Sequence, residues 1–206
     1  MRIDDVPEWD SQWEGLDPRF RLYLFYDGSS VSTHDIFDAN IHEALEAAHM
    51  MSQGDTMLWS LALVVDDSSY GRGLRWLSGS DYNGAPLNAV EWRARAVMQN
   101  RYLAAVTRAG REPRLPDGRR VIRMFCDWTT GWPLWESFTD HYVVGPAELS
   151  ISAELGADLT AWNERFCARH EDDPLPEGWM EEGIALAGRL QDEIAHEAEV
   201  RPEFLY

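Results

Sequence analysis

A long apolar run over residues 57–65 is the sequence feature that most constrains the fold. Its length and composition predict a strand that is buried on both faces. A glycine-rich turn and the run 73–77 follow, so residues 57–78 are predicted to form a hairpin. A further β-rich run, 20–26, ends at Asp27-Gly28 and predicts another strand before a turn. These strands argue against an all-helical fold.

Capping signals predict helices next to these strands. Asn40, with a glutamate three residues later, predicts a helix over 40–53. Asn88 has the same pattern and predicts a longer helix over about 89–109 that is apolar on two sides. A helix of that kind is expected to be a middle layer between two packed elements. The expected apolar faces are Ile41, Leu45 and Ala48 in the first helix, and Val90, Ala94 and Val97 with Trp92, Ala96 and Leu103 in the second.

The C-terminal part repeats the mixture of strands and helices. The expected elements are strands over 120–127 and 134–138, helices over 152–169 and 177–198, and a short edge strand over 200–205. Pro202 argues against a central position for the last strand. Apolar residues recur at helical spacing in both helices, namely Leu155, Leu159, Trp162 and Phe166, then Trp179, Gly183, Leu186, Leu190 and Ile194.

This order predicts an α+β fold, a single globular unit of two subdomain-like halves packed around the central helix at about 89–109. Four segments are expected along the chain. They are an acidic N-terminal arm over 1–18, a β-α-β-β-α half over 19–110, a linker or exposed turn over 111–119, and a β-β-α-α-β half over 120–206. Trp9 and Trp13 are expected to pin the arm to the surface.

Composition excludes several classes of function. The 206 residues carry a net charge of −18, and every one of the 18 cations is an arginine. Without lysine the chain cannot form a Schiff base or a Walker-type phosphate loop. A strongly negative protein repels nucleic acid and anionic membranes, so neither is an expected partner. The chain shows no signal peptide and no membrane-spanning run, and we expect a cytoplasmic protein.

The charge is distributed unevenly. Residues 89–126 carry a net charge of +6, whereas residues 127–206 carry −14. The first interpretation is internal pairing between the central arginines and the C-terminal helices. The second leaves part of the acidic C-terminal face free, which suits a partner with a basic surface. The prolines after Glu171, Asp172 and Asp173 are expected to hold these acids in an exposed loop.

The strongest local feature is the segment 127–138, which contains Trp128, Trp132 and Trp135. At least one of these indoles is expected to be a contact residue, because three indoles cannot all be buried in one small turn. With Glu136 and the acids Glu171, Asp172 and Asp173, they form the predicted partner-binding set. The alternative is an enzyme or small-ligand-binding protein whose pocket is walled by this Trp-rich segment.

No pattern identifies catalytic, cofactor-binding or metal-binding residues. Cys126 lies in an apolar run, and Cys167 with His170 lacks a second half-site for zinc. Two Glu-x-x-His units, Glu46/His49 and Glu193/His196, have the spacing seen in di-iron bundles. An acidic chain also produces this spacing by chance, so a solvated polar face is the simpler interpretation.

Several short motifs in the second half resemble those of known proteins. The motifs are Arg123-Met-Phe-Cys-Asp-Trp, Gly131-Trp-Pro-Leu-Trp-Glu-Ser, Leu-Ser-Ile-Ser, Trp162-Asn and Trp179-x-Glu-Glu-Gly183. Over residues 120–206 the chain resembles uncharacterised actinobacterial proteins that include small immunity-type proteins. Together with the acidic charge, the resemblance favours a non-catalytic interaction protein, such as an immunity or inhibitor protein that occludes a basic partner, for example a nuclease-type toxin.

Overall fold

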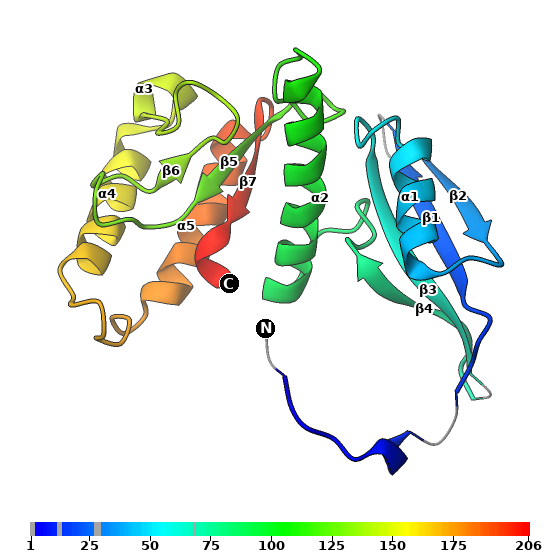
Figure 1. Ribbon diagram of the computed structural model, residues 1–206. Coiled ribbons are helices and arrows are strands. Elements are labelled where there is room, and N and C mark those ends of the chain that lie inside the picture. Colours follow the sequence, from blue (N-terminus) through cyan, green and yellow to red (C-terminus); the bar gives the residue numbers. More distant parts are fainter. Residues whose placement is uncertain (1–2, 12–13, 27–29, 68) are drawn as a thin grey trace.

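The computed structural model describes residues 3–11, 14–26, 30–67 and 69–206. The fold is α+β, as predicted, and helix α2 (Ala89–Arg108) stands between two β-sheets (Figure 1). Both halves pack around this helix as one globular unit. The middle-layer position that was expected for residues 89–109 is therefore confirmed.

The other elements follow the predicted order, with an added strand, an added one-turn α-helix and two short 3-10 helices. Before α2 they are η1 (Glu8–Asp10), β1 (Arg19–Phe25), β2 (Val31–Ile36), α1 (Ile41–Met51), β3 (Leu58–Asp67) and β4 (Gly71–Ser78). After α2 they are β5 (Arg120–Met124), β6 (Leu134–Trp135), α3 (Pro146–Leu149), α4 (Ala153–Cys167), α5 (Trp179–Ile194), β7 (Ala198–Pro202) and η3 (Glu203–Leu205). Strand β2 and the one-turn helix α3 were not predicted. The turn expected at Asp27-Gly28 lies outside the described residues.

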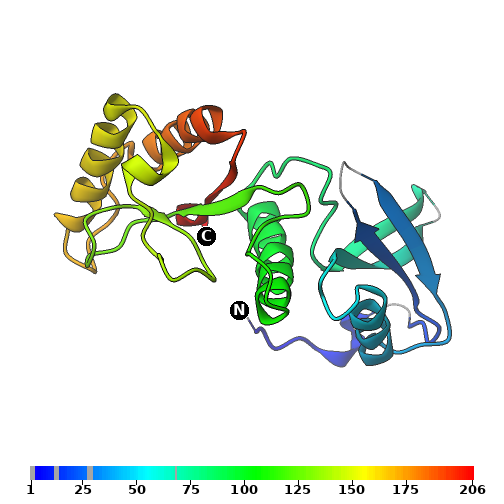
Figure 2. The same cartoon turned by 90° about the horizontal axis from the view of Figure 1, so that it is seen from above.

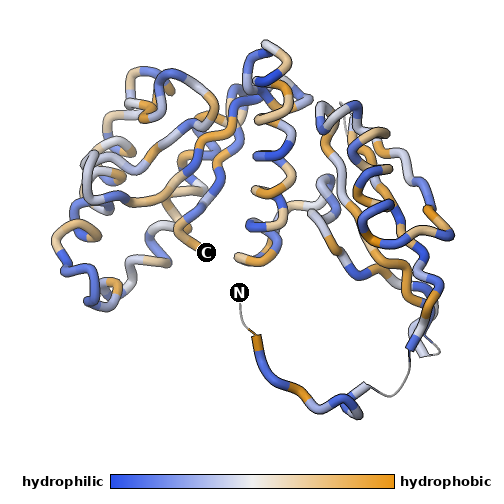
Figure 3. Tube along the Cα trace, viewed as in Figure 1, coloured by the Kyte–Doolittle hydropathy of each residue, from blue (hydrophilic) through white to orange (hydrophobic). Residues whose placement is uncertain are grey.

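The first sheet is antiparallel with the strand order β2-β1-β3-β4, and it contains the predicted hairpin as β3 and β4. Alternate residues of β1 and β3 point toward α1. The buried cluster on that face consists of Phe20, Leu22, Leu24, Ala44, Ala48, Trp59 and Leu61. Hydrophobic residues line the strands of this sheet in Figure 3.

The contact face of α1 differs from the prediction. Ala44 and Ala48 are fully buried, whereas Ile41 and Leu45 remain 39% and 37% exposed. Two alanines allow the helix backbone to approach the sheet closely, so the larger side chains beside them stay partly in solvent.

The second sheet has the strand order β6-β5-β7, with β5 antiparallel to β6 and parallel to β7. It lies between α2 on one side and the pair α4 and α5 on the other (Figure 2). Ile122 and Val200 pack toward α4 and α5, in the cluster that contains all the predicted stripe residues of both helices except the half-buried Phe166 and the glycine. Strand β7 is at the edge of the sheet, as expected.

Helix α2 is a middle layer, and its packed faces include the predicted Ala96 and Leu103 but otherwise consist of other residues than predicted. Its buried residues are Ala96, Met98, Gln99, Tyr102, Leu103, Ala105 and Val106. Val90 and Val97, which were expected on a packed face, are 78% and 50% exposed. The correction has a physical reason, because much of the α2 contact with the second sheet is polar and therefore invisible to hydrophobic periodicity.

The N-terminal arm does not pack as expected. Trp9 is 81% exposed, so its indole does not pin the arm, and Trp13 lies outside the described residues. The arm is extended apart from the short η1 turn and runs clear of the two sheets in Figure 1.

Candidate functional site

The β5–β6 connection holds its three tryptophans in three different environments. Trp135 is buried and donates from Nε1 to the carbonyl oxygen of Phe125 at 3.0 Å. Trp132 is half-buried and donates to the carbonyl oxygen of Val144 at 2.6 Å. Trp128 is 47% exposed. Only Trp128 of the three presents a large part of its ring to solvent.

A tight turn fixes the exposed indole in place. The Asp127 carboxylate accepts hydrogen bonds from the backbone nitrogen of Thr129, at 2.8 Å, and from the Thr129 hydroxyl. These bonds lower the pKa of Asp127, because they stabilise the charged carboxylate. Trp128 also packs on Phe166 from α4, with 4.7 Å between the ring centres. The site therefore begins with an indole beside a carboxylate that is ionised at neutral pH.

Arg169 joins Trp128 to the acidic loop that follows α4. Its guanidinium carbon lies 5.0 Å from the centre of the Trp128 ring and 4.3 Å from that of Phe166. The same guanidinium donates from Nη1 to the carbonyl oxygens of His170, Glu171 and Asp173, at 3.0 to 3.2 Å. One cation thus stacks on the indole and holds the backbone of the loop.

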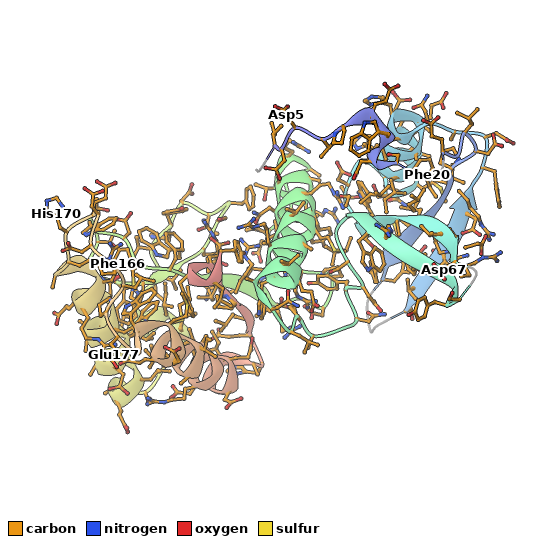
Figure 4. The ribbon with its side chains drawn as sticks, turned by 90° about the horizontal axis from the view of Figure 1, so that it is seen from below. Asp5, Phe20, Asp67, Phe166, His170 and Glu177 are labelled. Atoms are coloured by element: carbon orange, nitrogen blue, oxygen red, sulfur yellow. The ribbon has the colours of Figure 1, made fainter. Side chains whose placement is uncertain are left out.

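The acidic loop presents its carboxylates to solvent. Glu171, Asp172 and Asp173 are exposed, and Asp173 Oδ2 accepts a hydrogen bond from the backbone nitrogen of His170 at 2.9 Å. Within the described residues none of these three carboxylates forms an ion pair. Figure 4 shows His170 at the outer edge of this half, with Phe166 on its inner side. We call Trp128, Arg169 and residues 171–173 the Trp128–acid surface.

The predicted partner-binding set is divided by the structure. Trp128, Glu171, Asp172 and Asp173 meet at the Trp128–acid surface, whereas Trp132 and Trp135 are held by the scaffold. Glu136 is 7% exposed and accepts hydrogen bonds from Nε and Nη2 of Arg120, at 3.0 and 2.7 Å. Arg169 is absent from the predicted set, because its contact with Trp128 joins two segments that are distant in the sequence.

The two interpretations of the charge distribution both describe part of the molecule. Arginines of the central segment do form internal ion pairs instead of pairs with the C-terminal helices. Their partners lie in the first half, in the central segment itself, just after β6, in β7 and in η3. The pairs among the described residues are Arg95–Glu199, Arg101–Asp55, Arg114–Glu112, Arg119–Asp117, Arg119–Glu199, Arg120–Glu136 and Arg123–Glu203. Helices α4 and α5 pair with their own arginines, through Arg165–Glu182 and Arg189–Asp158. The acidic loop takes part in neither set.

The other candidate metal-binding and reactive residues do not come together in one site. The two Glu-x-x-His units lie in different halves. His49 contacts Asp55 at 3.0 Å, and Glu193 accepts from the backbone and hydroxyl of Ser152. In the described ranges no group of three His, Cys, Asp or Glu residues is arranged to hold a metal ion. Burial raises the pKa of the Cys126 thiol, which keeps it protonated and unreactive at neutral pH.

A cavity of about 320 Å³ borders the end of the Trp-rich segment. Its lining includes Glu136, His141 and Glu148, but none of the three indoles. The sequence predicted that a small-ligand pocket here would be walled by the tryptophans. The tryptophans do not line this cavity.

Comparison with known proteins shows that a segment of the second half resembles immunity-type proteins. Residues 120–202 match the model of a family described as Serratia CdiI immunity protein-like. The match begins at the first residue of β5, ends at the last residue of β7 and includes the Trp128–acid surface. It supports the resemblance of this segment to immunity-type proteins. The actinobacterial origin remains an expectation.

No curated protein and no solved structure matches the chain. Among the described helices, none has both the length and the apolar character needed to span a membrane.

Proposed function

We propose that this chain is an immunity protein that binds a basic toxin of the nuclease type and blocks it through the Trp128–acid surface. The observation that carries the proposal is the Arg169 contact, which joins an exposed indole to an acidic loop inside the matched segment. Tryptophan is enriched among residues that dominate binding energy. Unpaired carboxylates beside it attract a cationic partner and exclude anionic ones.

The proposal gives the protein a protein partner and a cytoplasmic location. A net charge of −18 opposes binding to nucleic acid or to an anionic membrane. A basic nuclease has the opposite charge, and an immunity protein can occlude the cationic groups with which such a toxin holds its substrate. Inhibition of this kind needs no catalytic residue in the inhibitor.

The test is to identify a binder by pull-down with this protein and to measure its association rate from low to high salt. Replacing Glu171, Asp172 and Asp173 by their amides is expected to slow association by about tenfold at low salt and to flatten the salt dependence. Trp128→Ala is expected to act on dissociation and to weaken binding by about 2 kcal/mol, or roughly thirtyfold.

A matched control neutralises three exposed carboxylates in the first half, by Glu8→Gln, Glu14→Gln and Glu46→Gln. The net charge changes equally, so a smaller effect of the control separates local recognition from overall charge. An association rate that is indifferent both to salt and to the three loop substitutions would show that the acidic loop serves solubility alone.

A further inference from the structure

A second feature of the molecule lies on the other side of α2, away from the Trp128–acid surface. It is a cavity of about 490 Å³ between the first sheet, α2 and the segment 111–119. The first sheet contributes the end of β1 and the residues just before β3, and Leu115 anchors the segment 111–119 by its burial in the adjoining core. The volume lies in the range of sites for small organic ligands, which concentrate where two parts of a fold meet.

Three aromatic residues line this cavity. Phe25 and Tyr102 are buried there in one hydrophobic cluster, and the ring of Tyr26 lies at the exposed margin. Phe25 and Tyr102 are only 3% and 7% exposed, so Tyr26, which is 44% exposed, offers the flat surface on which a planar group can stack. The Thr56 hydroxyl donates to the carbonyl oxygen of Gln53 at 3.1 Å, which leaves its oxygen able to accept a further hydrogen bond.

The charge of the cavity is opposite to that of the protein. Its described lining contains two arginines, Arg111 and Arg114, and no carboxylate. Arg111 is exposed and forms no ion pair with any described residue. Arg114 donates from Nε to Glu112 at 2.8 Å and from Nη1 to the carbonyl oxygen of Gly118 at 3.3 Å, so Nη2 is left for another acceptor. Because the chain has a net charge of −18, a cavity lined by two arginines calls for a specific explanation.

We propose that this cavity binds a small anion joined to a planar ring. Guanidinium groups match the planar geometry of phosphate and carboxylate oxygens, and they bind both by paired hydrogen bonds. The ring would stack on Tyr26 while Arg111 and Arg114 neutralise the anionic group. Nucleoside phosphates and aromatic carboxylates share this chemistry. The site is independent of toxin binding, because none of its lining belongs to the Trp128–acid surface.

Calorimetric titration of the intact protein with adenosine monophosphate and with indole-3-acetate tests the proposal and separates its two sources. At least one of these compounds is expected to bind with a Kd below about 1 mM. Adenosine and inorganic phosphate, which each supply one part of the ligand, are expected to bind at least tenfold more weakly. The proposal is wrong if neither compound binds, or if the isolated parts bind as well as the whole.

Variants locate the site. Arg111→Gln and Arg114→Gln are each expected to weaken binding of the better compound by about tenfold. Arg108→Gln is the matched control, because Arg108 is an exposed arginine near the C-terminal end of α2 that does not line the cavity. Circular dichroism shows whether each variant is folded. Equal affinity in all four proteins would place binding elsewhere and overturn the assignment.

Discussion

Arg95 on α2 and Glu199 on β7 form a two-pronged ion pair across the junction of the two halves. Arg95 donates from Nε to Glu199 Oε1 at 2.6 Å and from Nη2 to Oε2 at 2.9 Å. The side chains are 11% and 7% exposed. Gln99 also donates to Glu199 Oε1, at 2.7 Å, and Arg119 approaches its Oε2 at 3.5 Å. The carboxylate is thus surrounded by donors from outside its own strand.

Glu199→Gln is therefore expected to destabilise the protein by about 3 kcal/mol, because Arg95 is left buried without its counter-ion. Chemical denaturation measures the change in the free energy of unfolding. Glu154→Gln is the matched control. That carboxylate is 85% exposed and 3.9 Å from Arg189, so its loss is expected to cost less than about 0.5 kcal/mol. Equal costs would mean that the buried pair contributes no more than a surface contact.

Two glycines of α5 give a second prediction with opposite signs. A Cβ added at Gly183 would lie 2.7 Å from Trp162 Cζ2 and 2.9 Å from Phe204 Cε2. Trp162 cannot move away, because it is fully buried and stacked on Trp179 with 4.4 Å between ring centres. Gly183→Ala is expected to cost about 2 kcal/mol by overpacking.

Gly188→Ala, in the same helix, is the control. No atom lies within 4 Å of a Cβ at Gly188, which is exposed, so the alanine is expected to stabilise the helix by roughly 0.5–1 kcal/mol. Thermal or urea denaturation of the two variants measures both signs. A stabilised Gly183→Ala variant would contradict the close packing of α5 on Trp162.

The tryptophans of the β5–β6 connection give a third prediction. Trp135→Ala is expected to cost about 3–5 kcal/mol, because the side chain is 5% exposed and stacks on Phe125 at 4.9 Å between ring centres. Trp128→Ala removes contacts with Phe166 and Arg169 at the surface and is expected to cost about 1 kcal/mol. Urea denaturation measures the loss of stability in both variants. If Trp128→Ala lost more than Trp135→Ala, the Trp128 ring would be structural and the prediction that it contacts a partner would be wrong.

Periodicity predicted the elements that bury an apolar stripe. The faces of α4 and α5 were predicted in this way, and Leu159, Trp162 and Leu190 are all fully buried. Strand β2 was missed because its sequence, Val31–Ile36, is mostly polar and lies at an exposed edge of the first sheet. Pattern detection depends on burial, and an edge strand with little burial leaves no pattern.

The polar contacts between α2 and β7 could not be predicted from the sequence, for a different reason. Glu199 and Arg201 meet Arg95, Gln99 and Asn100 across about a hundred positions of the chain. A charged residue in a sequence gives no sign of a partner so far away, and its ordinary expectation is a solvated surface. The same limit applied to Arg169, whose function as a link depends on the approach of two separate loops. Trp128 and the acidic loop could be named individually, whereas their contact could not.

Asp35 on β2 gives a prediction on pH dependence. Arg21 donates to its carboxylate from Nε at 2.6 Å and from Nη2 at 3.1 Å, and Arg19 donates from Nε at 2.8 Å. These hydrogen bonds hold the pKa of Asp35 well below its usual range, and the bond from Arg21 has the largest effect. The unfolded chain binds the proton at a pH of about 3.9, so the folded state loses this stabilisation only as the pH falls below that value.

Asp35→Asn is therefore expected to lower stability by about 1–2 kcal/mol at pH 7, and the difference from the parent protein is expected to shrink as the pH falls from about 5 toward 2. Urea denaturation across this range measures the difference. Asp66→Asn is the control in the same sheet. Its pair with Arg72 at 2.8 Å is more than half exposed on both sides, so it is expected to change stability by less than about 0.5 kcal/mol. A pH-independent cost of Asp35→Asn would mean that its carboxylate acts through shape and neutral hydrogen bonds, with no contribution from its charge.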